Sequence, residues 1–152
     1  MKTITTPQAA HILGMRFRTL DNWVRTGLVT CSQMAGGHGT RRAWTVEDVT
    51  RAAYVQAMRK NGLSTQRLNG MKKSGGLDHL WESHREKERT HGEEYTGGDV
   101  YLLMKDRELV IPIRPKRKAI EKAFDALDAG LSPEPLSYDD EPFGGQVTVD
   151  RS

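Results

Sequence analysis

Apolar residues recur at helical spacing in four short stretches of the first half of the chain. Three of these stretches follow a hydroxyl side chain that can cap the first amides of a helix, at Thr5, Thr45 and Ser64. Gly14 and Gly27 come after the first two stretches, and glycine is the residue most often found just past a helix end. The pattern therefore predicts four short helices before about residue 74.

The second of these helices, over residues 16–26, has one apolar and one polar face. Leu20, Trp23 and Val24 share the apolar face at spacings i, i+3 and i+4. The opposite face carries side chains that can donate to phosphates or base edges, namely Arg18, Thr19, Asn22 and Arg25. A short helix, a glycine-containing turn and a second helix that is polar outward predict a helix-turn-helix.

Residues 28–44 predict a hairpin wing. Three glycines within four residues, at positions 36, 37 and 39, permit positive φ angles where the chain turns back, and two arginines follow them. Trp23 and Trp44 are expected in the core, because a buried position is far more common for tryptophan than a ligand site.

The second half of the chain predicts a small module of mixed structure. A helical stripe begins at Leu77, and apolar strands are expected at 99–104 and 108–113, joined as a hairpin with Pro112 near a sheet edge or a strand end. Pro115 opens a further helix that Gly130 closes, and residues 146–149 add a strand. The apolar side of that helix is formed by Ala119, Ile120, Ala123, Phe124 and Leu127. We therefore expect an α+β fold, with a winged helix-turn-helix followed by a small α+β module.

This pattern divides the chain into residues 1–73, a helix and glycine-rich linker at 74–98, and a hairpin, helix and strand module at 99–152 with an acidic tail at 132–142. Charge follows the same division. Residues 1–73 hold 12 of the 23 basic side chains but only three acidic ones, a balance of +9, whereas the whole chain carries +3. A polyanionic partner and a merely solvated basic face both agree with this asymmetry.

Several function classes are not expected. The single cysteine, Cys31, can form neither an internal disulfide nor a thiolate cluster, so a reducing cytoplasm is the predicted compartment. No stretch approaches the roughly 20 apolar residues that cross a bilayer, and no signal region precedes the first helix, so membrane and secreted classes drop out. His79, His84 and His91 lie among glutamates, but the first two are five residues apart and fall on different helix faces. We expect His84 to be a packing residue, and we expect no metal, cofactor or enzymatic activity.

Over residues 3–72 the sequence resembles the MerR-type winged helix-turn-helix regulators. The blocks that carry the resemblance stand in the family's order and spacing, and they are Thr5 to Ala10, Gly14 to Leu20, Gly27 to Val29, Gly39 to Trp44, and Thr45 to Val49. The C-terminal part resembles no family that we recognise. Asp21 stands where the family usually has a basic residue, and Asn22 where it has an aromatic one, so the base preferences of relatives do not transfer.

The resemblance, together with the polar face of the second helix, implies a set of candidate DNA-binding residues. They are Arg16, Arg18, Thr19, Asn22 and Arg25 in the helix, and His38, Thr40, Arg41 and Arg42 in the wing. Asp21 has two alternative roles, accepting from a cytosine N4 or orienting Arg18 or Arg25 one turn away. We favour the second role, because a carboxylate near phosphates is costly unless it is paired.

These features predict a cytoplasmic, nucleoid-associated protein that binds double-stranded DNA. The favoured function is a MerR-like transcriptional regulator whose second helix reads the major groove while a wing clamps the backbone. One alternative is an excisionase-like recombination accessory or phage packaging protein built on the same unit. Another is an interaction adaptor that has lost its affinity for DNA.

The mode of self-association is left open by the sequence. The resemblance implies a homodimer joined by a long coiled-coil helix, but five glycines interrupt residues 72–98, which argues against that route. A homodimer or higher oligomer through residues 77–149, in which the hairpin offers an edge strand, is one alternative. A monomer that binds cooperatively along DNA is the other.

Overall fold

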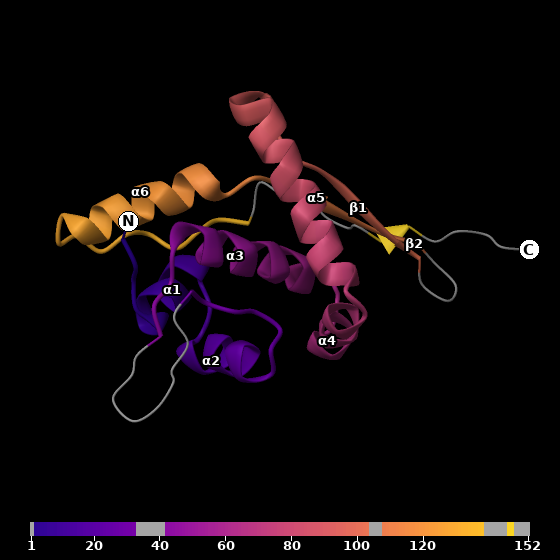
Figure 1. The fold of residues 1–152 in the computed structure, drawn as a ribbon, viewed down its shortest axis with the longest axis horizontal. Helices are drawn as coiled ribbons and strands as arrows, with labels where there is room; N and C mark the ends of the chain where they lie inside the picture. Colours follow the sequence, from indigo (N-terminus) through magenta and orange to yellow (C-terminus); the bar gives the residue numbers. More distant parts are fainter. Residues whose placement is uncertain (1, 33–41, 104–107, 139–145, 148–152) are drawn as a thin grey trace, which may run out of the picture. The chain divides into compact units, whose positions relative to one another are not determined.

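The computed structural model describes residues 2–32, 42–103, 108–138 and 146–147, and within these ranges helices dominate over a small antiparallel sheet (Figure 1). The α+β prediction is confirmed. The elements are α1 Thr6–Leu13, α2 Phe17–Arg25, α3 Val46–Lys60, α4 Thr65–Ser74, α5 Gly76–His91, the 3-10 helix η1 Gly92–Glu94, β1 Gly98–Leu103, β2 Glu108–Ile113, α6 Arg117–Asp128 and β3 Gln146–Val147. Among these helices none combines the length and the apolar character that a membrane crossing requires.

Helix α1 begins where the sequence predicts, because Thr5 and Gln8 form a capping box. The Thr5 hydroxyl accepts a hydrogen bond from the Gln8 amide at 3.3 Å, and the Gln8 side-chain oxygen accepts one from the Thr5 amide at 2.9 Å. Gly14 then adopts a left-handed conformation with φ of 68°, which ends the helix. Only Met15 and Arg16 separate this cap from the first residue of α2.

The predicted caps of α3 and α4 are confirmed. At the start of α3 the Asp48 carboxylate accepts from the Thr45 amide at 2.8 Å, and the Thr45 hydroxyl accepts from the Asp48 amide at 3.2 Å. Ser64 caps α4. Two predicted ends shift slightly: the C-cap of α2 is Thr26, one residue before the positive-φ Gly27, and α6 begins two residues after Pro115.

The chain divides into two compact units. Unit 1 consists of Met1–Gln56 with Lys116–Ser137, and unit 2 of Ala57–Pro115 with Tyr138–Ser152. Helix α6 and the residues that follow it thus cluster with the N-terminal helices, whereas the sequence predicts that they belong to a module at 99–152. The boundaries predicted after residues 73 and 98 stay a prediction for independently folding domains.

Unit 1 has a core of the kind that the sequence predicts. Trp23 and Trp44, expected to be core residues, retain only 2% and 0% of their surface. Helix α6 joins this core through Ile120 and Phe124, which are both buried. Ala119 was expected on the same side but is exposed, and Leu127 is half-buried, because the buried stripe of α6 is narrower than its apolar stripe.

Helix α6 and the segment after it are also held to unit 1 by polar contacts. Arg117 Nη2 lies 2.5 Å from Glu47 Oε2 at the start of α3, and Lys2 pairs with Asp128. The Leu136 amide donates to the Ile12 carbonyl at 2.8 Å. That carbonyl belongs to the last turn of α1 and has no partner within the helix, so residues 131–137 serve as an external cap for α1.

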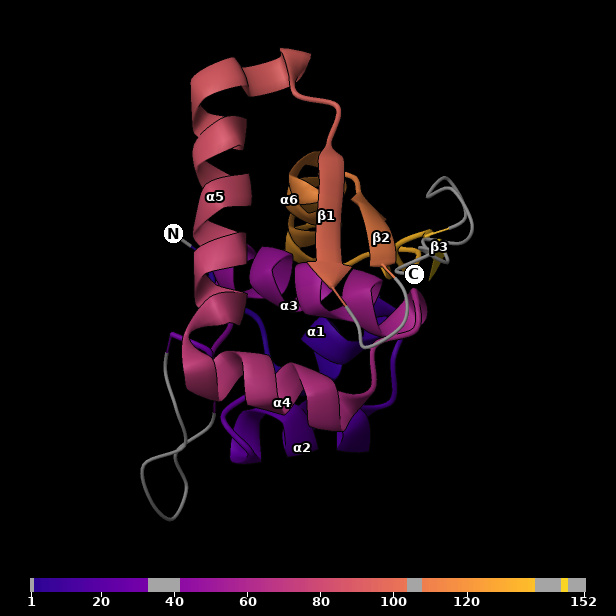
Figure 2. The same cartoon turned by 90° about the vertical axis from the view of Figure 1, so that its right-hand side faces the viewer.

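Unit 2 contains the two strands of the predicted hairpin and a short additional strand, while residues 104–107 and 148–149 of these predictions lie outside the described residues. β1 pairs antiparallel with β2, as Figure 2 shows, and β3 pairs with the other side of β2. β1 therefore lies at an edge of the sheet. Leu109 and Ile111 of β2 are buried, whereas Tyr101 and Leu103 of β1 are 62% and 67% exposed. Pro112 lies one residue from the end of β2, near the strand end as expected.

Candidate nucleic-acid interface

Helix α2 separates its side chains into a buried and an exposed face, as the sequence predicts. Leu20, Trp23 and Val24 retain no more than 3% of their surface. The opposite face exposes all five candidate residues assigned to this helix and its cap: Arg16, Arg18, Thr19, Asn22 and Arg25. Packing of the apolar face fixes the rotation of the helix, so these polar side chains point away from unit 1.

Both ends of α2 are anchored by backbone hydrogen bonds. On the N-terminal side the Met15 amide donates to the Ala10 carbonyl of α1 at 3.0 Å, which sets the turn between the two helices. On the C-terminal side the Leu28 amide donates to the Trp23 carbonyl at 2.9 Å, and the Leu28 side chain is buried. The arrangement is a helix-turn-helix with its second helix held at both ends.

Asp21 is paired with two arginines. Arg25 Nε lies 2.9 Å from one carboxylate oxygen of Asp21, one turn along α2, and the other oxygen accepts from Arg42. The side chains of Asp21 and Arg42 are each only 16% exposed, whereas that of Arg25 is 71% exposed. The expected role of Asp21 in orienting Arg25 therefore has a structural basis, and the contact with Arg42 is an addition that the sequence did not indicate.

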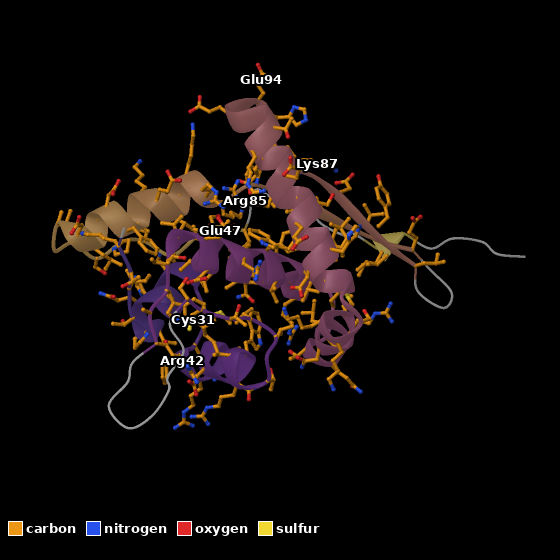
Figure 3. All side chains as sticks on the ribbon, in the orientation of Figure 1. Cys31, Arg42, Glu47, Arg85, Lys87 and Glu94 are labelled. Carbon is orange, nitrogen blue, oxygen red and sulfur yellow. The ribbon has the colours of Figure 1, made fainter. Side chains whose placement is uncertain are left out.

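Arg42 ties α2 to the C-terminal end of the predicted wing. It precedes Trp44 by two residues and lies beside α2 (Figure 3). The Trp44 indole donates to the buried Thr6 hydroxyl at 2.9 Å, and its backbone forms a bridge with Ile4. These contacts fix the point at which the chain leaves the predicted wing and enters α3.

The N-terminal end of the predicted wing is fixed by the cap of α3. The Asp48 carboxylate, which accepts from the Thr45 amide, also accepts from the Ser32 amide at 2.8 Å. Asp48 thus links the backbones of Ser32 and Thr45. The candidate residues His38, Thr40 and Arg41, and the hairpin itself, lie outside the described residues.

Sequence reasoning missed three features of this region. The bond between Asp21 and Arg42 joins residues 21 positions apart, and the bond between Ser32 and Asp48 joins residues 16 positions apart, so neither has a local signal. Phe17, the first residue of α2, is 47% exposed. Its spacing of three residues before Leu20 suggests burial, and only the structure shows that its ring is half outside.

In unit 2, the prediction that His84 packs in the interior is confirmed, since it is 8% exposed. Its Nδ1 lies 2.8 Å from the Tyr95 hydroxyl, and its Nε2 lies 3.4 Å from Glu88. Burial raises the pKa of Tyr95, the Glu88 carboxylate raises it further, and Arg114 opposes both effects. His79 and His91 are exposed, and within the described ranges no three His, Cys, Asp or Glu side chains gather as a metal site requires.

Comparison with known proteins gives the region a family. A family model described as the MerR HTH family regulatory protein matches residues 4–74. One protein of Mycobacterium bovis and two from strains of Mycobacterium tuberculosis are 33% identical to this chain over 75 residues. Each of them is described as an uncharacterized HTH-type transcriptional regulator.

The matched segment is 49% of this chain and 31% of each mycobacterial protein, so the chain covers about a third of the length of these relatives. Nothing in the matches supports the excisionase-like alternative. The resemblance seen in the sequence is confirmed by the family model. Residues 4–74 of the chain are a MerR-type helix-turn-helix segment.

Proposed function

We propose that this chain binds double-stranded DNA through α2 and acts as a regulator of transcription at the nucleoid. One observation carries the proposal. Within the MerR-type segment, α2 is anchored at both ends and turns Arg16, Arg18, Thr19, Asn22 and Arg25 outward. A helix of this kind fits the major groove, which is about 12 Å wide.

The positions along α2 suggest different roles for its side chains. Arg18 lies in the first turn, where recognition helices reach base edges, and Asn22 lies one turn later on the same face. We assign base contacts to these two residues, since Arg pairs with guanine and Asn with adenine. Arg16 and Arg25, at the two ends of the helix, would contact phosphates, and Thr19 would contact either.

The electrostatics of α2 favour a polyanion. Its first turn contains no acidic residue and no side-chain cap, so the positive end of the helix dipole is not neutralised locally. Asp21 is the only acidic residue of α2, and its charge is matched by Arg25 and Arg42. The helix can therefore approach phosphates without presenting an unpaired carboxylate.

For the wing, the proposal separates the two neighbouring arginines. Arg42 is largely buried against Asp21, so we assign it a positioning role that holds the wing end against α2. His38, Thr40 and Arg41 would make the wing contacts to the backbone. The wing therefore still contacts the DNA backbone, as the sequence predicts, but Arg42 positions the wing instead of contacting DNA.

The proposal is tested with duplexes selected by the purified full chain from a random pool. Arg18→Ala should weaken binding to the selected duplex by about 5- to 150-fold and relax the preference at one position. Arg89→Ala is the matched control, because Arg89 is an exposed arginine of α5 and its loss changes the net charge equally. Equal losses for both variants would reject the assignment of α2, and failure to select any duplex would reject DNA binding itself.

We further propose that two copies of the chain associate through β1 when they bind DNA together. β1 lies within residues 77–149, the range in which the sequence predicts self-association. β1 is an edge strand, and its Tyr101 and Leu103 side chains are exposed. Antiparallel pairing of two β1 strands would bring these apolar side chains together. Sedimentation should then show a dimer that Leu103→Lys converts to monomer, and a monomeric native chain with and without DNA would refute this route.

A further inference from the structure

The N-terminus of α2 carries an aromatic side chain with nearly half of its surface exposed. Phe17 is the first residue of the helix and is 47% exposed. Among the described residues, the other large hydrophobic side chains in this class are Tyr101, Leu103 and Leu131, and these belong to β1 and to the segment after α6. Of these four exposed hydrophobic residues in the described part of the chain, Phe17 alone lies on the candidate DNA-binding helix.

The surroundings of Phe17 are polar. Arg16, Arg18 and Thr19 next to it are all exposed, and Asp21, one turn further on, is paired with arginines. The apolar face of α2 is already filled by Leu20, Trp23 and Val24. The exposed part of Phe17 is thus a small apolar area set within a cationic surface.

We infer that Phe17 determines specificity by contacting the 5-methyl group of a thymine in the major groove. The inference rests on the proposed function and adds an apolar contact, which the charged candidates of α2 do not supply. Thymine presents the only methyl group among the four bases in that groove, and an apolar contact is the means by which a protein recognises it. The N-terminal residues of a recognition helix are those that reach base edges.

The position of Phe17 next to Arg18 predicts where the thymine lies in the DNA site. Arg18 follows Phe17 in the first turn of α2, and consecutive Cα atoms are about 3.8 Å apart, so if both side chains reach base edges we expect them to contact neighbouring base pairs. The preferred site should therefore contain a thymine adjacent to the base that Arg18 reads. Covering one methyl group corresponds to a change of about fourfold in Kd.

The experiment uses the duplex selected by the full chain, synthesised with each thymine replaced in turn by deoxyuridine, which lacks only the methyl group. Kd is measured for the native chain, for Phe17→Ala and for Phe17→Leu. For the native chain, the replacement should weaken binding by about fourfold at the thymine adjacent to the base that Arg18 reads. Phe17→Ala should be indifferent to the same replacement, and Phe17→Leu should keep part of the effect. Leu131→Ala, which removes an exposed apolar side chain after α6, is the matched control and should respond like the native chain.

Each outcome decides between distinct conclusions. Equal sensitivity to deoxyuridine in the native chain and Phe17→Ala, or indifference of the native chain at every thymine, would overturn the role of Phe17 while leaving DNA binding intact. Loss of folding in Phe17→Ala, seen as a lower thermal midpoint with Phe17→Leu also indifferent to the methyl group, would assign Phe17 to packing instead. Failure of the native chain to select any duplex would overturn both the inference and the function on which it rests.

Discussion

Two arginines pair with the carboxylate of Asp21, and replacing each of them should affect a different property of the protein. Arg42 is mostly buried with Asp21, each side chain being 16% exposed, whereas Arg25 is 71% exposed and one helical turn from Asp21. Arg42→Ala should therefore reduce the stability of the fold, and Arg25→Ala should reduce DNA binding with little effect on stability. Comparing the two variants therefore distinguishes the arginine that stabilises the fold from the arginine that is proposed to contact DNA, although both bind Asp21.

The magnitude for Arg42 follows from its environment. A hydrogen bond between charged groups that are largely shielded from water contributes about 1.5–3 kcal/mol. Two features lower the expected loss: Arg25 still pairs with Asp21 in the variant, and the buried Nε of Arg42 has no acceptor within the described part of the chain. We expect Arg42→Ala to lower the free energy of unfolding by about 1–2 kcal/mol. An exposed pair one turn apart, such as Asp21 with Arg25, contributes only about 0.3–0.5 kcal/mol.

Urea denaturation followed by tryptophan fluorescence measures both losses, and equal slopes in urea would show that the variants expose the same surface on unfolding. DNA binding is measured as a function of salt concentration, where loss of one phosphate contact in Arg25→Ala should reduce the salt slope by about one. The reasoning is refuted if the two variants lose the same free energy of unfolding, or if Arg42→Ala alone changes the salt slope.

Three further predictions concern the fold around this interface. Trp44→Phe removes the buried bond from the indole to Thr6 and should lower the free energy of unfolding by about 2 kcal/mol, with an unchanged value contradicting the bond. Phe124→Ala in α6 should cost about 3 kcal/mol, whereas Leu131→Ala, at a side chain 63% exposed, should cost almost nothing; equal effects would mean that α6 is not part of the core. The raised pKa of Tyr95 means that its contribution to stability is fully present below about pH 10 and is lost as pH rises through the folded-state pKa. Denaturation at pH 9 and pH 11 should therefore show a smaller loss for Tyr95→Phe than for the native chain, and identical losses would contradict the shift.

The helices of the first half could be predicted because their signals are local. Thr5 with Gln8, and Thr45 with Asp48, are three residues apart, and each pair forms its hydrogen bonds within one turn. The same holds for the exposed face of α2, since a period of 3.6 residues places Arg18 and Asn22 opposite the buried residues whatever the rest of the chain does. Sequence periodicity was less exact for α6, where Ala119 lies on the apolar stripe but outside the buried one.

The contacts that hold the candidate interface in place are not local, and sequence alone gave no means to find them. Nothing near Asp21 indicates that its partner is Arg42, because an arginine in a glycine-rich segment is equally suited to a phosphate. The bond of Asp48 to the Thr45 amide is local, but its second bond, to Ser32, depends on where the chain returns after residues 33–41. In each case one carboxylate performs a local role that is visible in the sequence and a distant role that is not.

The grouping of α6 with the N-terminal helices follows from the same difference and bears on the proposed function. The last-turn carbonyls of α1 need partners, and Gly14 supplies a cap for only part of that turn. Leu136 bonds the Ile12 carbonyl, and the Pro133 carbonyl lies 2.7 Å from Nε2 of His11, so residues 131–137 complete the end of α1 from far along the chain. Since the turn from α1 into α2 starts at that end, a chain shortened before residue 116 would keep every candidate DNA-binding residue and lose part of what orients them. The candidate interface within residues 4–74 is therefore supported in part by residues that the family match does not cover.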